Sequence, residues 1–359
     1  MHMRVRTVLS KLALLPLLLL GTGAAGAADT KLHVVAALPN LGSIAAEIGG
    51  DRIEVTTIAS GLQDAHFVDP KPSFIVKLRG ADLILVNGLD LEIGWIPPLV
   101  QGARNAHLLP GGDGYIDCSS RVGVLEIPTG AVSRAAGDVH PYGNPHYLTD
   151  PLNAEPIATC IAEALGRKAP ASASYFEERR AGFVRRLQAA MFGKDLVELV
   201  GGSKLARLAQ SGELKSFLDS SESGGRPLAE RLGGWMGAMR PYEGAKIVTY
   251  HKDFSYFARR FGLDVVEYVE PKPGIPPSAK HLAELTQMLQ GGQVKLLLTR
   301  PYVEHRSTSL LADSTKIQVL TLPMEVGGAP EATDYVALFD YLVSSISTAL
   351  RGAPAGAGR

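Results

Sequence analysis

Three histidines stand in loops where a strand has just ended or a helix is about to begin. His66 follows an apolar strand that ends near Ala59, within SGLQDAHFVDPKPS. His146 lies in GNPHYLTDP, ahead of a helix expected from Asn153, and His251 comes directly after the strand KIVTY. Neutral imidazole is a good ligand for Zn²⁺, Cu²⁺ and Ni²⁺, whereas Mn²⁺, Mg²⁺ and Ca²⁺ prefer oxygen. A single histidine is more often structural, but the three together indicate a metal site built from nitrogen donors.

These loops belong to an alternation of strands and helices. Apolar strands are expected at 31–38, 52–59 and 82–86 in the first half, and at 246–250, 264–268, 294–298 and 317–322 in the second. Continuous apolar strands between helices are typical of a buried, mostly parallel sheet. Ligands of such sheets bind beyond the carboxyl ends of the strands. His66 and His251 satisfy this rule from opposite halves of the chain, so we predict two α/β lobes that direct imidazoles into one cleft.

A long amphipathic helix is predicted between the two halves, from about residue 172 to residue 199. Phe176, Phe183, Leu187 and Met191 recur at helical spacing and should pack into the core. At roughly 1.5 Å per residue this helix would be ~40 Å long and would act as a strut between the lobes. The predicted organisation is a cleaved signal peptide at 1–28, an N-terminal lobe at 29–170, the linking helix at 171–200, a helical excursion at 201–243, a C-terminal lobe at 244–351 and a disordered tail at 352–359.

The N-terminus has the pattern of a secretory signal peptide. Basic residues at positions 4, 6 and 11 precede a short apolar run, and small residues follow up to Ala27 and Ala28. The apolar run is too short to cross a bilayer core of ~30 Å as a helix. No cysteine stands at the expected cleavage point, so no lipid anchor is predicted. We expect a soluble, exported protein of the periplasm with no direct membrane insertion.

The composition limits the classes of ligand and leaves the redox state open. The 359 residues include 36 basic and 36 acidic side chains. Removal of three basic residues with the signal peptide leaves 33 against 36, a net charge of −3. With no basic excess, nucleic acid is not expected as a ligand. Cys118 and Cys160 are the only cysteines, and in an exported protein they could either pair or remain thiols.

Six longer segments carry a family resemblance. They are LGSIAAEIGGDRIEV, GLQDAHFVDPKPS, GADLILVNGLDLE, GDVHPYGNPHYLTDP, YHKDFSYFARRFGL and EPKPGIPPS. In this order, and over nearly the whole mature chain, they resemble the periplasmic zinc/manganese-binding proteins of metal ABC transporters. The resemblance implies two α/β lobes joined by a rigid long helix, with the metal between them. It places the first three ligands at His66, His146 and His251, and a histidine in the third position resembles the zinc-type members.

The fourth ligand position departs from the family pattern. The family commonly supplies an Asp just after a late strand, where this chain has Pro323 and Met324. Glu325 is the nearest carboxylate and is our predicted substitute. Asp334, His140, water or no fourth ligand remain alternatives, since zinc can hold three protein ligands and a water.

Other residues of these loops have predicted supporting roles. His140 lies six residues before His146, and the resemblance implies that such a loop histidine could capture or hand over metal; the alternative is a bystander. Asp64 and Asp69 are candidates to accept the second N–H of His66, because ligating imidazoles usually donate their other nitrogen.

The resulting functional prediction is high-affinity binding of Zn(II), with Mn(II) less favoured, and its delivery to the membrane permease of an ABC transporter for uptake. The zinc is the transported ligand, and the protein is expected to act as a monomer and not as an enzyme. The alternative is an exported zinc-dependent hydrolase with a three-histidine zinc–water site. Against it, the sequence contains neither HExxH nor GxSxG, and Glu325 is the one candidate general base.

Overall fold

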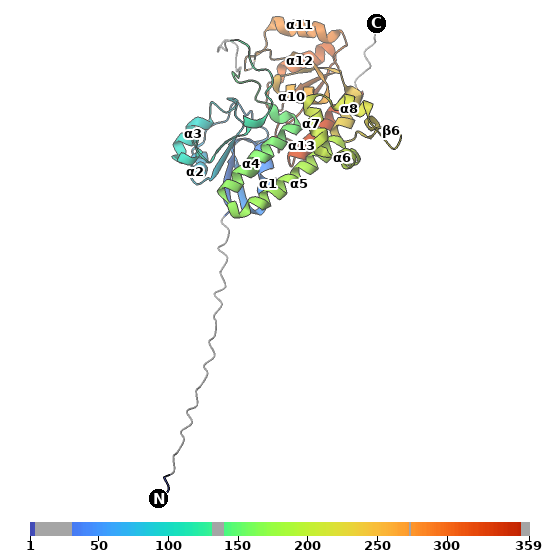
Figure 1. The fold of residues 1–359 in the computed structure, drawn as a ribbon. Helices are drawn as coiled ribbons and strands as arrows, with labels where there is room; N and C mark the ends of the chain where they lie inside the picture. Colours follow the sequence, from blue (N-terminus) through green and yellow to red (C-terminus); the bar gives the residue numbers. More distant parts are fainter. Residues whose placement is uncertain (4–30, 131–139, 273, 353–359) are drawn as a thin grey trace. The chain divides into compact units, whose positions relative to one another are not determined.

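Two parallel four-stranded sheets form the framework of the protein (Figure 1). The computed structural model describes residues 1–3, 31–130, 140–272 and 274–352. The predicted signal peptide from residue 4 onward and the predicted tail after residue 352 lie outside the described residues. The first sheet has the order β2-β1-β3-β4 and consists of β1 (Leu32–Ala36), β2 (Ile53–Thr57), β3 (Leu83–Val86) and β4 (Tyr115–Asp117). The second has the order β10-β9-β7-β8 and consists of β7 (Lys246–Thr249), β8 (Asp264–Tyr268), β9 (Leu296–Thr299) and β10 (Gln318–Thr321).

The strands of each sheet all run in one direction. In the first sheet Val34 of β1 is in register with Val55 of β2 on one side and with Leu83 of β3 on the other. In the second, Ile247 of β7 is in register with Leu296 of β9. All four residues of β3 and all four of β9 are buried, as expected for apolar strands covered on both faces. The predicted α/β class with mostly parallel sheets is confirmed.

Helices pack around both sheets. They are α1 (Pro39–Gly49), α2 (Pro72–Arg79), α3 (Ile96–Ala103), α4 (Ala154–Lys168), α10 (Ser255–Phe261), α11 (Ala279–Gln290), α12 (Arg306–Thr315) and α13 (Tyr335–Gly352). Figure 1 shows α2 and α3 beside the first sheet and α11 and α12 beside the second, while α4 and α5 run side by side. In the described part of the chain, no helix has the length and apolar character needed to cross a membrane.

The linking helix is shorter than predicted. Helix α5 spans Ala173–Phe192 and buries Phe176, Phe183 and Met191, which confirms the predicted apolar stripe. It ends at Gly193, whose φ of 85° lies in the left-handed region that glycine adopts readily. A Cβ at this position would also lie 2.9 Å from the Cα atom of Gly233, so the chain passes close to another backbone here. Helix α6 (Lys194–Val200) is therefore a separate element and not the last turns of one strut.

The region after α6 is helical with one short hairpin. It contains α7 (Gly202–Ser211), α8 (Leu214–Ser220), β5 (Glu222–Ser223), β6 (Arg226–Pro227) and α9 (Gly234–Met239). Helix α9 packs on α5 and α13. The two cysteines are both free thiols, with Cys118 buried and Cys160 half-buried.

Hydrogen bonds tie the two sheet regions together close to the carboxyl ends of the strands. Asn40, at the start of α1, donates its side-chain amide to the Met324 carbonyl (2.9 Å) and accepts from the Val326 amide (2.9 Å). On another side, Asn144 donates to the Lys252 carbonyl (2.7 Å). Residues of both sheets also share one continuous hydrophobic core. Because buried polar groups are rarely left unpaired, these bonds fix how the loops beyond the strands meet.

The loop that carries His66 meets the loop after β10 through glycines. A Cβ at Gly61 would lie 2.4 Å from the nitrogen of Gly328 and 2.5 Å from the carbonyl carbon of Gly327. Backbone atoms cannot move aside as the end of a flexible side chain can. The close contact therefore requires glycine at position 61.

We expect Gly61→Ala to lower the free energy of unfolding by ~1–3 kcal/mol, because it overpacks a backbone contact. Gly94→Ala is the matched control, since no atom lies within 4 Å of its added Cβ. Chemical denaturation of both variants measures the difference. Equal effects of the two substitutions would show that this contact is not close in solution.

Candidate metal centre

Three imidazoles converge beyond the carboxyl ends of the two sheets. Within the described residues, one potential ligand atom from each of His66, His146 and His251 lies within 4.8 Å of the other two. Their ring centroids are 5.1 Å (His66–His146), 5.3 Å (His146–His251) and 5.6 Å (His66–His251) apart. A tetrahedral zinc ion at ~2.0–2.1 Å from each nitrogen requires nitrogens about 3.3 Å apart, so the three rings would draw closer together around the ion. The structure therefore brings together the three histidines that the sequence predicts.

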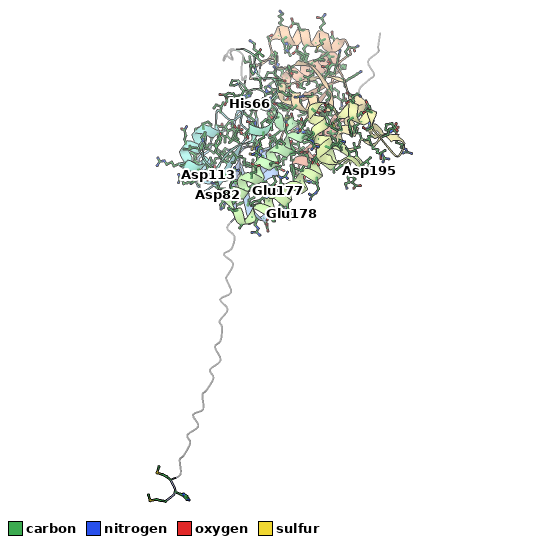
Figure 2. The ribbon with its side chains drawn as sticks, viewed as in Figure 1. His66, Asp82, Asp113, Glu177, Glu178 and Asp195 are labelled. Carbon is green, nitrogen blue, oxygen red and sulfur yellow. The ribbon has the colours of Figure 1, made fainter. Side chains whose placement is uncertain are left out.

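His66 reaches the cluster from the first sheet. It lies in the loop after β2, and Figure 2 shows it at the end of the first sheet opposite Asp82, which directly precedes β3. The indole of Trp95 donates to the carbonyl of Ala65 (2.9 Å) and thereby holds the neighbouring backbone. The Nδ1 atom of His66 lies 2.7 Å from Asp64 Oδ1. Because a carboxylate can only accept, Nδ1 donates and the lone pair of Nε2 is left for the centre of the cluster.

His251 is oriented in the same way from the second sheet. It stands two residues after β7, and its Nδ1 atom lies 3.0 Å from Oε1 of Glu270, which stands two residues after the neighbouring strand β8. The amide of Gly274 donates to the same oxygen (2.8 Å) and fixes the carboxylate. Two carboxylates therefore hold two of the three imidazoles, one from each sheet.

His146 is fixed through its backbone. Its amide donates to Asn144 Oδ1 (2.9 Å), and its carbonyl accepts from the Thr149 hydroxyl (2.8 Å). The same hydroxyl lies 3.1 Å from the carbonyl of Asp253, which stands two residues after His251. The three rings form a nearly equilateral triangle, with His146 at about the same distance from each of the other two.

The nitrogens at the centre have no hydrogen-bond partner. The Nε2 atoms of His66, His146 and His140 are buried and unpaired among the described residues. Burial lowers the pKa of His146 well below its usual value, and the neighbouring histidines lower it further. Burial also lowers the pKa of His251, against the opposing hydrogen bond to Glu270. Neutral imidazoles with unpaired lone pairs are the state that metal binding requires.

His140 supplies a fourth imidazole beside the cluster. Its ring centroid lies 5.3 Å from that of His66, although its nitrogens do not belong to the group within 4.8 Å. Burial and the nearby His66 and His251 lower its pKa to about 4. Sequence reasoning left His140 open between a capture role and a bystander, and the structure places it next to the candidate site.

The structure does not bring the other predicted carboxylates into this group. Glu325 is buried, and its Oε2 atom accepts from the amide of Asn40 (2.8 Å) at the first turn of α1. Asp334 accepts from the amides of Val336 and Ala337 at the start of α13. Both acids satisfy backbone donors at helix starts, which the sequence pattern did not reveal. Of the two predicted partners of His66, Asp64 makes the contact and Asp69 is exposed.

Sequence reasoning also missed two charged residues of the site, Glu270 and Arg300. Each stands one or two residues beyond the carboxyl end of a strand of the second sheet, which is the signal that could have identified them. Arg300 and His66 both line a cavity of about 260 Å³ that opens beside His251, and a smaller one of about 30 Å³ beside His146. The cluster therefore lies against a cavity large enough for an ion and its waters.

This fold and site define a class: a two-lobed α/β protein that holds a small ligand between its sheets. The sequence matches the family described as "Zinc-uptake complex component A periplasmic" (ZnuA) over residues 34–191 and 235–349. The chain belongs to this family, the metal-binding substrate-binding proteins of metal ABC transporters. These are solute-binding proteins and not enzymes, which supports binding over the hydrolase alternative. The match leaves out residues 192–234, which correspond to α6–α8 and the short hairpin.

Individual relatives differ in the metal for which they are named. The chain is 26% identical to the metal ABC transporter substrate-binding lipoprotein FimA of Streptococcus parasanguinis, over 88% of each chain. It is 25% identical to the manganese ABC transporter substrate-binding lipoprotein PsaA of Streptococcus pneumoniae, over 83% of this chain and 81% of the relative. A zinc-bound ZnuA deletion mutant has the same fold, with a TM-score of 0.64 at 19% identity over 90% of this chain and 100% of that one.

The buried Glu325 should make stability depend on pH. Burial raises the pKa of Glu325 from 4.5 to about 8. A raised folded-state pKa means that the neutral carboxyl contributes stability fully below pH ~4.5, and that this stability is lost as the pH rises through about 8. The free energy of unfolding falls by about 1.4 kcal/mol for each unit by which the pKa is raised. In the metal-free protein we expect Glu325→Gln to remove this pH-dependent loss of stability.

The measurement is the free energy of unfolding of both proteins between pH 5 and pH 9, with chelator present. The wild type should weaken relative to the variant as the pH rises. Parallel curves would contradict a neutral, buried Glu325.

Proposed function

We propose that this protein binds Zn(II) with high affinity in the periplasm and delivers it to the permease of an ABC transporter for uptake. The observation that carries the proposal is the convergence of His66, His146 and His251, with two buried Nε2 atoms that have no other partner. A metal cation is the ligand that satisfies several imidazole lone pairs at one point.

The donor set supports zinc over manganese. The three converging ligands are nitrogens, and imidazole suits Zn²⁺ whereas Mn²⁺ prefers carboxylate, carbonyl and water oxygens. Cu²⁺ and Ni²⁺ also accept imidazole, so elemental analysis of protein purified without chelator is the first experiment. Zinc as the predominant metal supports the proposal, and manganese as the predominant metal would overturn it.

We further propose that His140 takes the fourth coordination position. Its Nε2 atom is buried and unpaired, and its ring lies beside that of His66. Glu325, the alternative from sequence, already accepts a hydrogen bond from Asn40. Since His140 stands just outside the cluster, it would move toward the cation on binding.

The proposed route of the cargo follows from the family. A substrate-binding protein of an ABC transporter passes its ligand to a membrane permease, which is the partner that we propose here. The N-terminal pattern of basic, apolar and small residues supports export to the periplasm. The bonds that tie the two sheet regions together favour modest lobe motion at release, as expected from the resemblance.

Removal of any one ligand should greatly weaken zinc binding. We expect His66→Ala, His146→Ala and His251→Ala each to raise the Kd for zinc at least about 100-fold, with the fold intact. Calorimetric titration measures the Kd, and circular dichroism checks the fold. His107→Ala is the matched control, because this exposed imidazole bonds Asp113 away from the site and should leave the Kd unchanged. Wild-type affinity in all three ligand variants would end the proposal.

The fourth position can be tested separately. We expect His140→Ala to raise the Kd for zinc by roughly 10-fold, less than the loss of a converging ligand, because water can replace a fourth ligand. Glu325→Gln should leave the Kd nearly unchanged. If Glu325→Gln weakens binding and His140→Ala does not, the fourth ligand is the carboxylate.

A further inference from the structure

A buried arginine stands beside the candidate metal site. Arg300 follows β9, is 4% exposed, and lines the two cavities that also contain His66. Arginine stays protonated in proteins, so this positive charge is permanent. A fixed positive charge repels a metal cation, so its presence here calls for a function that outweighs that repulsion.

Arg300 is paired with two acids that adjoin the metal-binding histidines. Its Nε atom lies 2.9 Å from Asp253 Oδ2, and its Nη1 atom lies 3.8 Å from Asp64 Oδ2. The guanidinium also stacks on the Tyr302 ring, 5.0 Å from its centroid. Asp64 bonds His66 through its other oxygen. Asp253 stands two residues after His251.

Asp253 depends on Arg300 more than Asp64 does. Asp253 is 1% exposed, and neither of its carboxylate oxygens has a hydrogen-bond partner among the described residues. The ion pair with Arg300 is thus what compensates its charge. Without it, an unpaired buried carboxylate would either bind a proton or become a ligand for a cation.

Arg300 is a positive charge among several acids near the histidines. Asp64, Glu270 and Glu304 line the larger cavity together with Arg300, and Asp253 is its closest ion-pair partner. Loss of Arg300 would leave Asp253 without this partner.

We infer that Arg300 sets the metal selectivity of the site by withholding the Asp253 carboxylate from the cation. The cation then meets imidazole nitrogens and no second-sheet carboxylate oxygen. Zinc is satisfied by such a site, whereas manganese needs the oxygen that Arg300 occupies. This inference rests on the proposed zinc-binding function.

The test compares zinc and manganese affinities of the wild type and Arg300→Gln by competition titration on the full mature chain. We expect the Kd for manganese to fall at least 10-fold more than the Kd for zinc in the variant, because the loss of the positive charge favours both ions alike whereas the freed Asp253 carboxylate favours manganese. Equal gains for both ions would mean that Arg300 acts only by charge repulsion, and no gain for manganese would mean that Asp253 cannot reach the ion. Either result overturns the inference.

The matched control is the double variant Arg300→Gln/Asp253→Asn, which removes the carboxylate together with its partner. Its manganese affinity should return to the wild-type value, and a gain equal to that of Arg300→Gln would overturn the inference. If Arg300→Gln alone does not fold, thermal melts with manganese or with zinc replace the titration. Manganese should then restore folded protein better than zinc, and rescue by zinc alone would contradict the assignment. Wild-type protein that fails to bind zinc would instead refute the proposed function itself.

Discussion

The site depends on keeping several imidazoles uncharged at close range. With ring centres 5.1–5.6 Å apart, protonated histidines would repel one another, and burial penalises the charge further. A carboxylate orients each of the rings of His66 and His251. It accepts a hydrogen bond from the Nδ1 atom of the ring, so the lone pair of Nε2 remains free for the centre of the cluster. The unpaired Nε2 atoms of His66 and His146 are then free to bind a cation.

The arrangement of the two sheets explains why these side chains lie close together. All strands of a parallel sheet end at the same edge, so His66, His251, Glu270 and Arg300 arise in loops at the carboxyl ends of two sheets that face one another. The Gly61–Gly328 contact and the bonds of Asn40 and Asn144 hold these edges together. Solved structures of a zinc-bound ZnuA and of a manganese-bound periplasmic metal-binding protein share this fold, so the fold alone does not select the metal.

The sheets and the three converging histidines could be predicted from local patterns in the sequence: apolar strands, histidines just beyond two of them at 66 and 251, and His146 in a loop ahead of a helix. It did not predict the end of α5, where Gly193 adopts a left-handed conformation next to Gly233. Nor could it assign Glu325, because its partner is the amide of Asn40, 285 positions away in the sequence. Long-range hydrogen bonds and ion pairs, including Arg300 with Asp64, depend on how the two halves meet and leave no periodic signal.

The central claim is that one ion joins the three histidines across the two sheets. Anomalous diffraction from crystals of the zinc-loaded protein tests it most directly. We expect a single zinc peak at ~2.0–2.1 Å from a ring nitrogen of each of His66, His146 and His251. A zinc ion bound elsewhere, or bound by fewer than two of these rings, would contradict it.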